Sequence, residues 1–181
     1  MNTYIALLRG INVSGHKMIS MPALREALAE LPVSGISTYI QSGNVIFKSE
    51  LSEKEQLAKL ISAKILEKFA YEVPVIVVTP ADLVHVLNNN PFPLETLQDG
   101  KQPYVNFASS EPAHHDIEIL KTIDFGADRF AIIEKAIYVY YADSAGKTKL
   151  TTAVLEKKLE IVATARNWKT VNKLLELSSR G

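Results

Sequence analysis

The chain of 181 residues contains no cysteine, carries no net charge and has no long apolar run. Without cysteine it can form neither a disulfide framework nor a thiolate metal site. No apolar run approaches the roughly eighteen residues of a transmembrane helix. The start of the chain also lacks the charged segment and the cleavage site of a signal peptide. We therefore expect a cytoplasmic protein without a membrane partner.

The 20 basic and 20 acidic residues cancel, which excludes a uniformly basic nucleic-acid-binding protein. The charges are nevertheless unevenly spread along the sequence. Residues 1–25 contain three cationic and no acidic side chains, and residues 144–173 contain seven cationic and two acidic ones. A local positive site is therefore compatible with zero net charge.

The first half of the chain predicts the element order βαββαβ, which is the ferredoxin-like unit. Ser42-Gly43 joins two β-rich runs and predicts a hairpin, because glycine supplies the positive φ of a tight turn. Ser52 opens a capping-box pattern ahead of a helix. Pro80 begins a further short helix, with Thr79 as its N-cap. The predicted strands are 4–9, 36–41, 44–47 and 73–79.

The second half repeats this pattern, with strands at 104–108, 129–134, 137–142 and 161–164 and a terminal helix capped by Asn167. We expect an α+β protein of two tandem ferredoxin-like subdomains with extra helices. The expected domains are 1–90, a linker at 91–102, and 103–181. Several strands are apolar on both faces, so we expect sheets covered on both sides rather than an exposed RNA-reading sheet.

The segment from Arg9 to Lys17 nearly matches a phosphate-binding P-loop, with G-x-x-x-x-G between a strand and a helix. A P-loop needs G-K-[ST] at the start of the helix. Here His16 intervenes and Met18 replaces the metal-binding hydroxyl, which excludes a Walker-type NTPase. Two interpretations remain open: a looser anion contact through Arg9, Asn12 and Lys17, or an ordinary turn.

Three further polar segments lie at turns or helix starts. Gln41 and Asn44 flank the hairpin tip, where turn formation alone is the simpler explanation and a site requires both side chains to face a ligand. Lys149 and Thr151 precede a helix, where an anion could bind or the threonines could simply cap. Arg166 offers a bidentate fork for phosphate or carboxylate. The histidines give no metal site, since His114 and His115 are adjacent and diverge on a helix.

The sequence resembles the bacterial family known as domain of unknown function 1697, through the segments YIALLRGINVSG, MPALREAL, TYIQSGNVIF, KTKLTTAVLEKKL and TARNWKTVNKL. The resemblance covers most of the chain, and residues 51–143 are similar mainly in pattern. It implies a cytoplasmic α+β protein of two ferredoxin-like subdomains. It adds no catalytic residues, because the family has no established activity. The sequence departs from the family at Ser14, Lys17 and Thr152, where glycine, asparagine and asparagine are usual.

Our leading hypothesis is a binding module for an anionic ligand, a nucleotide or nucleic acid, held in a cleft between the two subdomains. We expect no cofactor and no metal. The alternatives are an enzyme that acts on a phosphorylated or carboxylated small molecule and a self-associating domain that forms a homo-oligomer. The candidate ligand-binding residues are Arg9, Asn12, Lys17, Gln41, Asn44, Lys149, Thr151 and Arg166.

Overall fold

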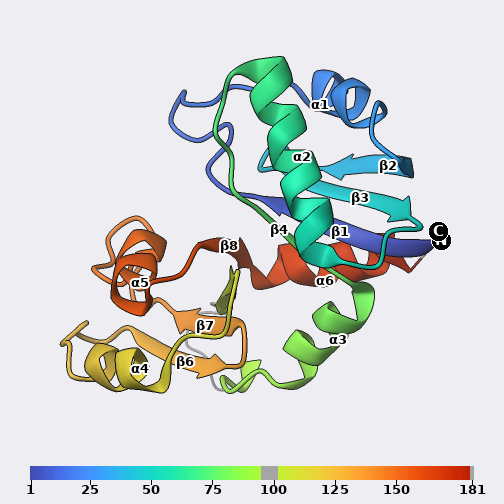
Figure 1. Ribbon diagram of the computed structural model, residues 1–181. Coiled ribbons are helices and arrows are strands. Elements are labelled where there is room, and N and C mark those ends of the chain that lie inside the picture. The colour runs from blue at the N-terminus through green and yellow to red at the C-terminus, as the bar shows by residue number, and fades with distance from the viewer. Residues whose placement is uncertain (95–101, 180–181) are drawn as a thin grey trace. The chain divides into compact units, whose positions relative to one another are not determined.

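The computed structural model describes residues 1–94 and 102–179 (Figure 1). These residues form two four-stranded antiparallel sheets and six helices. The chain divides into two compact units: unit 1 is Met1–His85 with Asn172–Gly181, and unit 2 is Val86–Val171. The fold is therefore of mixed α+β class, as the sequence predicts.

Unit 1 contains one sheet whose strand order is β2-β3-β1-β4. The predicted order βαββαβ is present, and the hairpin turns through Gly43, whose φ is +76°. Its elements are β1 (Asn2–Leu8), α1 (Met21–Leu28), β2 (Val33–Tyr39), β3 (Asn44–Ser49), α2 (Lys54–Phe69) and β4 (Val75–Val78), followed by α3 (Pro80–Asn88).

The core of unit 1 lies between its sheet and helices α1 and α2, which cover one face (Figure 1). Tyr4 and Ala6 of β1 face this core, and Leu57 and Ile61 of α2 pack into it at a spacing of one helical turn. On the opposite face of β1, Ile5 is also buried. The burial of both faces agrees with the apolar character of the strand.

Two helix starts in unit 1 differ in how they are capped. The predicted capping box at Ser52 is wrong, since α2 begins at Lys54 and its N-cap, Glu53, makes no side-chain capping bond. A reciprocal cap forms at α3 instead. There Asp82 N donates to Thr79 Oγ1 at 3.1 Å, and Thr79 N donates to an Asp82 carboxylate oxygen at 2.7 Å.

Unit 2 repeats the order of elements, and its strands run β6-β7-β5-β8 across the sheet. Helices α4 and α5 contribute Leu120, Leu155 and Leu159 to its core, where they meet Ile137 and Val139 of the sheet. The elements are β5 (Tyr104–Ala108), α4 (His114–Lys121), β6 (Arg129–Ile133), β7 (Ala136–Tyr140), α5 (Thr152–Leu159) and β8 (Ala163–Asn167).

Helix α6 (Trp168–Ser178) follows directly after β8. As predicted, Asn167 caps it, because its Oδ1 accepts a hydrogen bond from Thr170 N at 2.8 Å. The predicted domains assign this whole helix to the second half, whereas the division into units places residues from Asn172 onward with unit 1. Of the predicted linker 91–102, residues 95–101 lie outside the described residues.

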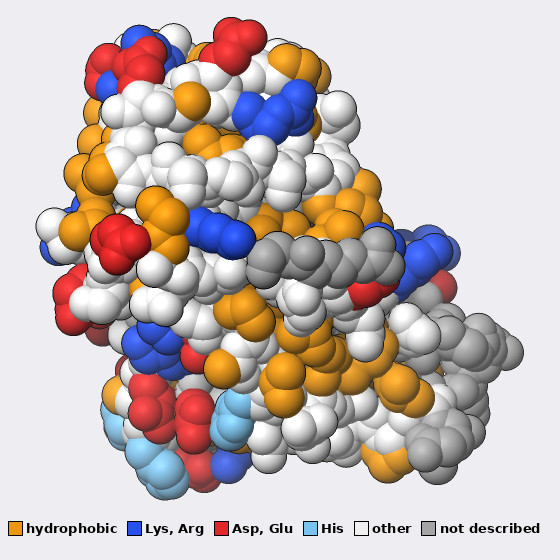
Figure 2. All heavy atoms as spheres, turned by 90° about the vertical axis from the view of Figure 1, so that its right-hand side faces the viewer, with side chains coloured by type: hydrophobic (Ala, Val, Ile, Leu, Met, Phe, Trp, Pro, Cys, Tyr) orange, Lys and Arg blue, Asp and Glu red, His pale blue; other side chains and the backbone are white. Residues whose placement is uncertain are grey.

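The face of the molecule drawn in Figure 2 carries acidic, basic and apolar side chains side by side. No continuous basic surface covers the described part of this face, in keeping with the equal numbers of basic and acidic residues. Any anion site on this face is therefore local.

Candidate functional site

In unit 1, the loop after β1 and the hairpin tip are brought together by Asn12. Its Nδ2 donates to the carbonyl oxygens of Ile19 and Gln41, and its Oδ1 accepts from Ile19 N, all at 2.8 Å. The close approach continues at Gly43, where an added Cβ would lie 2.7 Å from Leu8 Cβ. Two of the four predicted polar segments, the loop after β1 and the hairpin tip, are thus in contact. The side-chain amide of Asn12 makes this contact.

The other predicted residues of unit 1 differ in their exposure. Asn44 is fully buried, and its Nδ2 donates to Tyr39 O and Ser42 Oγ at 3.1 Å, which stabilises the turn. Lys17 Nζ donates to the carbonyl oxygen of Glu72. Arg9 is half-buried, and Gln41 is exposed.

In unit 2 the loop of residues 146–152, which we call the lysine loop, is fixed by a carboxylate that the sequence does not point to. Asp128 Oδ1 accepts from Ala142 N at 2.8 Å, and Asp128 Oδ2 accepts from the Thr148 hydroxyl. Thr151 Oγ1 accepts from Val154 N at 3.2 Å and so caps α5. Lys149 is exposed to solvent. No local pattern indicates Asp128, because it precedes its partners Ala142 and Thr148 by 14 and 20 residues.

Arg166 is buried in β8, where only 6% of its surface is exposed. Its Nη1 donates to Thr164 Oγ1 and to the carbonyl oxygen of Ala165, both at 2.8 Å. Burial lowers the pKa of the Arg166 guanidinium to about 10. Arg166 is predicted to bind a ligand, but its guanidinium instead binds two groups of its own strand. Its neighbour Asn167 is exposed.

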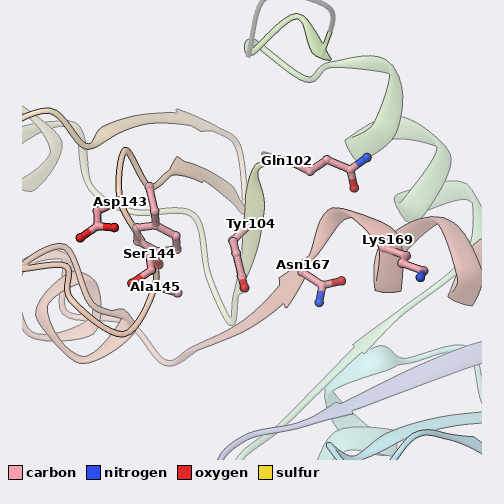
Figure 3. A pocket seen from close by; sticks show the side chains of 8 residues that line it. Gln102, Tyr104, Asp143, Ser144, Ala145, Asn167 and Lys169 are labelled. Carbon is pink, nitrogen blue, oxygen red and sulfur yellow. The ribbon is translucent and has the colours of Figure 1, made fainter. Parts of the chain in front are cut away.

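An open pocket of about 370 Å³ lies in unit 2 beside the start of α6 (Figure 3). Asp143, Ser144 and Ala145, which precede the lysine loop, line one side, and Asn167 and Lys169, which follow Arg166, line the other (Figure 3). We call this pocket the Tyr104 pocket. Its lining residues are Gln102, Tyr104, Tyr141, Asp143, Ser144, Ala145, Asn167 and Lys169.

The aromatic wall of the pocket is set by strand register. Tyr104 lies directly opposite Asn167 in the β5–β8 pairing, so their side chains share one face of the sheet (Figure 3). The rings of Tyr104 and Tyr141 meet edge to face with centroids 5.2 Å apart. Burial raises the pKa of the Tyr141 phenol to about 12.

The charged groups of the pocket are not equivalent. Asp143 forms an exposed ion pair with Lys147 at 3.2 Å. Lys169 lies in the first turn of α6, which contains no acidic residue, and it forms no ion pair with any residue that the structure describes. A cation at a helix N-terminus opposes the helix dipole, unless an anion is bound there as well.

Sequence reasoning did not select the residues that line this pocket. Lys169 and Asn167 stand in the same segment as Arg166, but the sequence favours the arginine because of its bidentate geometry. Gln102 and Tyr104 carry no local signal, because only the pairing of β5 with β8 places them beside α6. Whether the segments of units 1 and 2 meet stays a prediction, since the two units are described separately.

Two kinds of feature, a metal-binding cluster and a membrane-spanning helix, are absent from the described residues. No three His, Asp or Glu side chains lie close enough to hold a metal ion within 1–94 and 102–179. Over the same ranges, no helix combines the length and the apolar character needed to cross a membrane.

The two units define a protein of mixed α+β class. The chain belongs to the family described as protein of unknown function DUF1697, which matches residues 1–138. In fold it is similar to the conserved bacterial protein SP0830 from Streptococcus pneumoniae, with a TM-score of 0.74 and 23% sequence identity over 97% of this chain and 98% of that one. No curated protein matches the chain.

Proposed function

We propose that the protein is a binding module for an anionic ligand of the nucleotide class, free or as part of a nucleic acid, and that the Tyr104 pocket receives it. The observation that carries the proposal is Lys169. This cation stands in the first turn of α6, without an acidic partner among the described residues, and lines a pocket that also has an aromatic wall. The same proposal takes both units as ferredoxin-like, because each has the same strand order.

The phosphate end of the ligand is expected to lie at the start of α6. The ammonium of Lys169 and the positive end of the α6 dipole supply positive charge there, while the amides of Trp168 and Thr170 are already bound by Pro103 O and Asn167 Oδ1. Ser144 and Asn167 add hydrogen-bonding groups from the two sides of the pocket. This arrangement suits a phosphate better than a carboxylate, because several donors from different directions can be used at once.

The ring of the ligand is expected to lie against Tyr104. A half-exposed tyrosine offers a flat apolar face for a nucleobase, and base–aromatic stacking contributes about 1–3 kcal/mol per base. The volume of about 370 Å³ falls within the range of roughly 300–1,000 Å³ that is usual for small-molecule sites. The side-chain amide of Gln102, which also lines the pocket, can form hydrogen bonds with the polar edge of a base.

The enzyme alternative is less well supported. In that alternative Lys149 or Lys17 is the electrostatic catalyst and His16 the acid or base, and none of them lines the Tyr104 pocket. The self-association alternative gives no role to the Tyr104 pocket. The binding module therefore accounts for more of the observed geometry than either alternative.

Tryptophan fluorescence gives a direct test, because Trp168 is the only tryptophan and stands between the pocket residues Asn167 and Lys169. The full chain is titrated with adenosine monophosphate, adenosine and inorganic phosphate at low and at high salt. We expect the monophosphate to bind more tightly than either part, and its affinity to fall with salt. Equal binding of adenosine and its monophosphate would contradict a phosphate site.

Matched lysine variants locate the site. Lys169→Met keeps the aliphatic stem and removes the charge, and Lys157→Met does the same at an exposed position of α5. We expect the first variant to weaken monophosphate binding about tenfold, which corresponds to about 1.4 kcal/mol, and the second to leave it unchanged. Equal effects of the two variants would mean that only the overall charge matters.

A further inference from the structure

A second surface, independent of the Tyr104 pocket, lies in unit 1. Val13, Met18 and Ile40 are exposed to 54%, 60% and 49%. Each is adjacent in sequence to one of three residues that the Asn12 amide joins, namely Asn12 itself, Ile19 and Gln41. The backbone therefore brings three exposed aliphatic residues from two segments into one small region. We call these three residues the aliphatic tip.

Ile40 is unfavourable at its position for two separate reasons. Its φ is +50°, a left-handed conformation that suits glycine or asparagine and is strained for a β-branched residue. Its side chain is also half exposed to water. The strain persists because Asn44 binds Tyr39 O on one side and Asn12 binds Gln41 O on the other. A residue that breaks two local rules at once indicates a use for its side chain.

Cationic groups accompany the aliphatic tip. Residues 1–25 hold Arg9, Lys17 and Arg25 and no acidic residue. Lys17 Nζ donates to the carbonyl of Glu72, and Arg25 Nη1 donates to the Thr38 hydroxyl at 2.7 Å. Both acceptors are neutral, so these contacts fix the cations without cancelling their charge.

This chemistry disfavours several occupants. Three side chains offer far less than the roughly 800 Å² per partner of a stable protein interface, which disfavours a second copy. Stacking on single-stranded nucleic acid needs aromatic side chains, and the aliphatic tip has none. A lipid bilayer, in contrast, accepts aliphatic side chains without a shaped complementary surface.

We propose that the aliphatic tip docks on an anionic lipid bilayer as a peripheral contact, a membrane partner that the sequence analysis did not predict. Val13, Met18 and Ile40 enter the boundary between headgroups and acyl chains. Lys17 and Arg25 remain at the level of the lipid phosphates, where each cation is attracted by the negative surface potential. The contact is reversible, because a few aliphatic side chains and cations bind much less strongly than a spanning helix.

The test uses sedimentation of the full chain with vesicles. One set contains phosphatidylcholine with about one-third phosphatidylglycerol, and the other contains phosphatidylcholine alone. We expect partitioning to the anionic vesicles that is about tenfold or more stronger than to the neutral ones, and that weakens as salt is added. Equal partitioning to both, or none to either, would overturn the proposal.

A substitution at Ile40 separates docking from folding. Ile40→Asn removes the aliphatic side chain and installs a residue that tolerates the left-handed conformation, so the protein should remain at least as stable in urea. We expect its partitioning to fall about tenfold, whereas Ile119→Asn, at a comparably exposed site on α4, should leave partitioning unchanged. Unchanged partitioning of Ile40→Asn would overturn the proposal. So would binding of a short DNA duplex in place of vesicles, if Ile40→Asn weakened it.

Discussion

The side-chain amide of Asn12 donates a hydrogen bond to the carbonyl of Gln41 over 2.8 Å, and so ties the loop after β1 to the turn between β2 and β3. The same amide binds both backbone groups of Ile19. Asn12 therefore organises one end of unit 1, and residues that lie far apart in sequence share a surface because of it.

Replacing Asn12 tests this organising role. Asn12→Ala leaves the carbonyls of Gln41 and Ile19 without their donor, and the free energy of unfolding should fall by about 1–3 kcal/mol. Ser14→Ala is the matched control, since Ser14 lies in the same loop with a similar positive φ of 49°. Its effect should stay within about 0.5 kcal/mol, as is usual for exposed surface positions. Urea unfolding of both variants measures the difference, and equal losses would refute the role of the amide.

Two glycines separate backbone strain from steric crowding. Gly43 and Gly10 have similar φ values of +76° and +69°, but only Gly43 has atoms within 4 Å of an added Cβ, the nearest being Leu8 Cβ at 2.7 Å. Gly10→Ala should lower the free energy of unfolding by about 1 kcal/mol through strain alone. Gly43→Ala should lower it by a further 1–3 kcal/mol or so through overpacking. Equal losses in urea unfolding would show that the close approach is not rigid.

Local sequence signals were sufficient where the structure depends on neighbours in the chain. The turn at Gly43, the cap of α3 by Thr79 and the cap of α6 by Asn167 all follow from residues within three positions of one another. The capping-box pattern at Ser52 failed because the chain enters α2 two residues later, with Glu53 as N-cap. A pattern of this kind shows that a helix begins, but its exact start depends on tertiary packing.

The candidate site could be predicted only in part, because its contacts are long-range. The positions of the polar segments, at turns and helix starts, followed from the sequence. Their individual roles did not, since Asn12 binds a carbonyl 29 positions away and Asp128 binds Thr148, 20 positions away. The sequence neighbours of Arg166 do not show that it is buried in a strand. The sequence alone therefore predicts a ligand-binding role for it.

A buried polar pair in unit 2 gives a further test. The Thr152 hydroxyl donates to Asn106 Oδ1 at 2.7 Å, while Asn106 Nδ2 is buried without a hydrogen-bond partner. Thr152→Val should lower the free energy of unfolding by about 1–3 kcal/mol, because Asn106 then has no partner for its oxygen either. Adding Asn106→Leu should restore much of this loss, since both polar groups are then gone. A double-mutant cycle in urea measures the coupling, and strictly additive losses would contradict it.

Stability should decline at alkaline pH. Burial raises the pKa of both Tyr138 and Tyr141 to about 12, against 10.0 for an exposed phenol. Between these values the folded protein keeps two protons that the unfolded chain has lost, so stability falls as the pH rises. Arg166 acts in the opposite direction, because burial lowers its pKa to about 10 and the unfolded chain then holds the extra proton.

The two phenols destabilise the folded state as the pH rises, and the one guanidinium stabilises it. The net change between about pH 10 and pH 12 should therefore be a loss of stability. Tyr141→Phe keeps the ring and removes one titrating group, and the decline should become shallower. Urea midpoints at about pH 9 and about pH 11 provide the measurement. A decline of unchanged steepness in Tyr141→Phe would show that its phenol does not titrate in this way.

The central claim, that the Tyr104 pocket receives a nucleotide, is tested most directly by NMR on the ¹⁵N-labelled chain during titration with adenosine monophosphate at low salt. The account predicts saturable shifts of the backbone amides of Ser144, Asn167 and Lys169, which line the pocket, and their loss in Lys169→Met but not in Lys157→Met. Shifts confined to other surfaces, or no shifts at any ligand concentration, would contradict it.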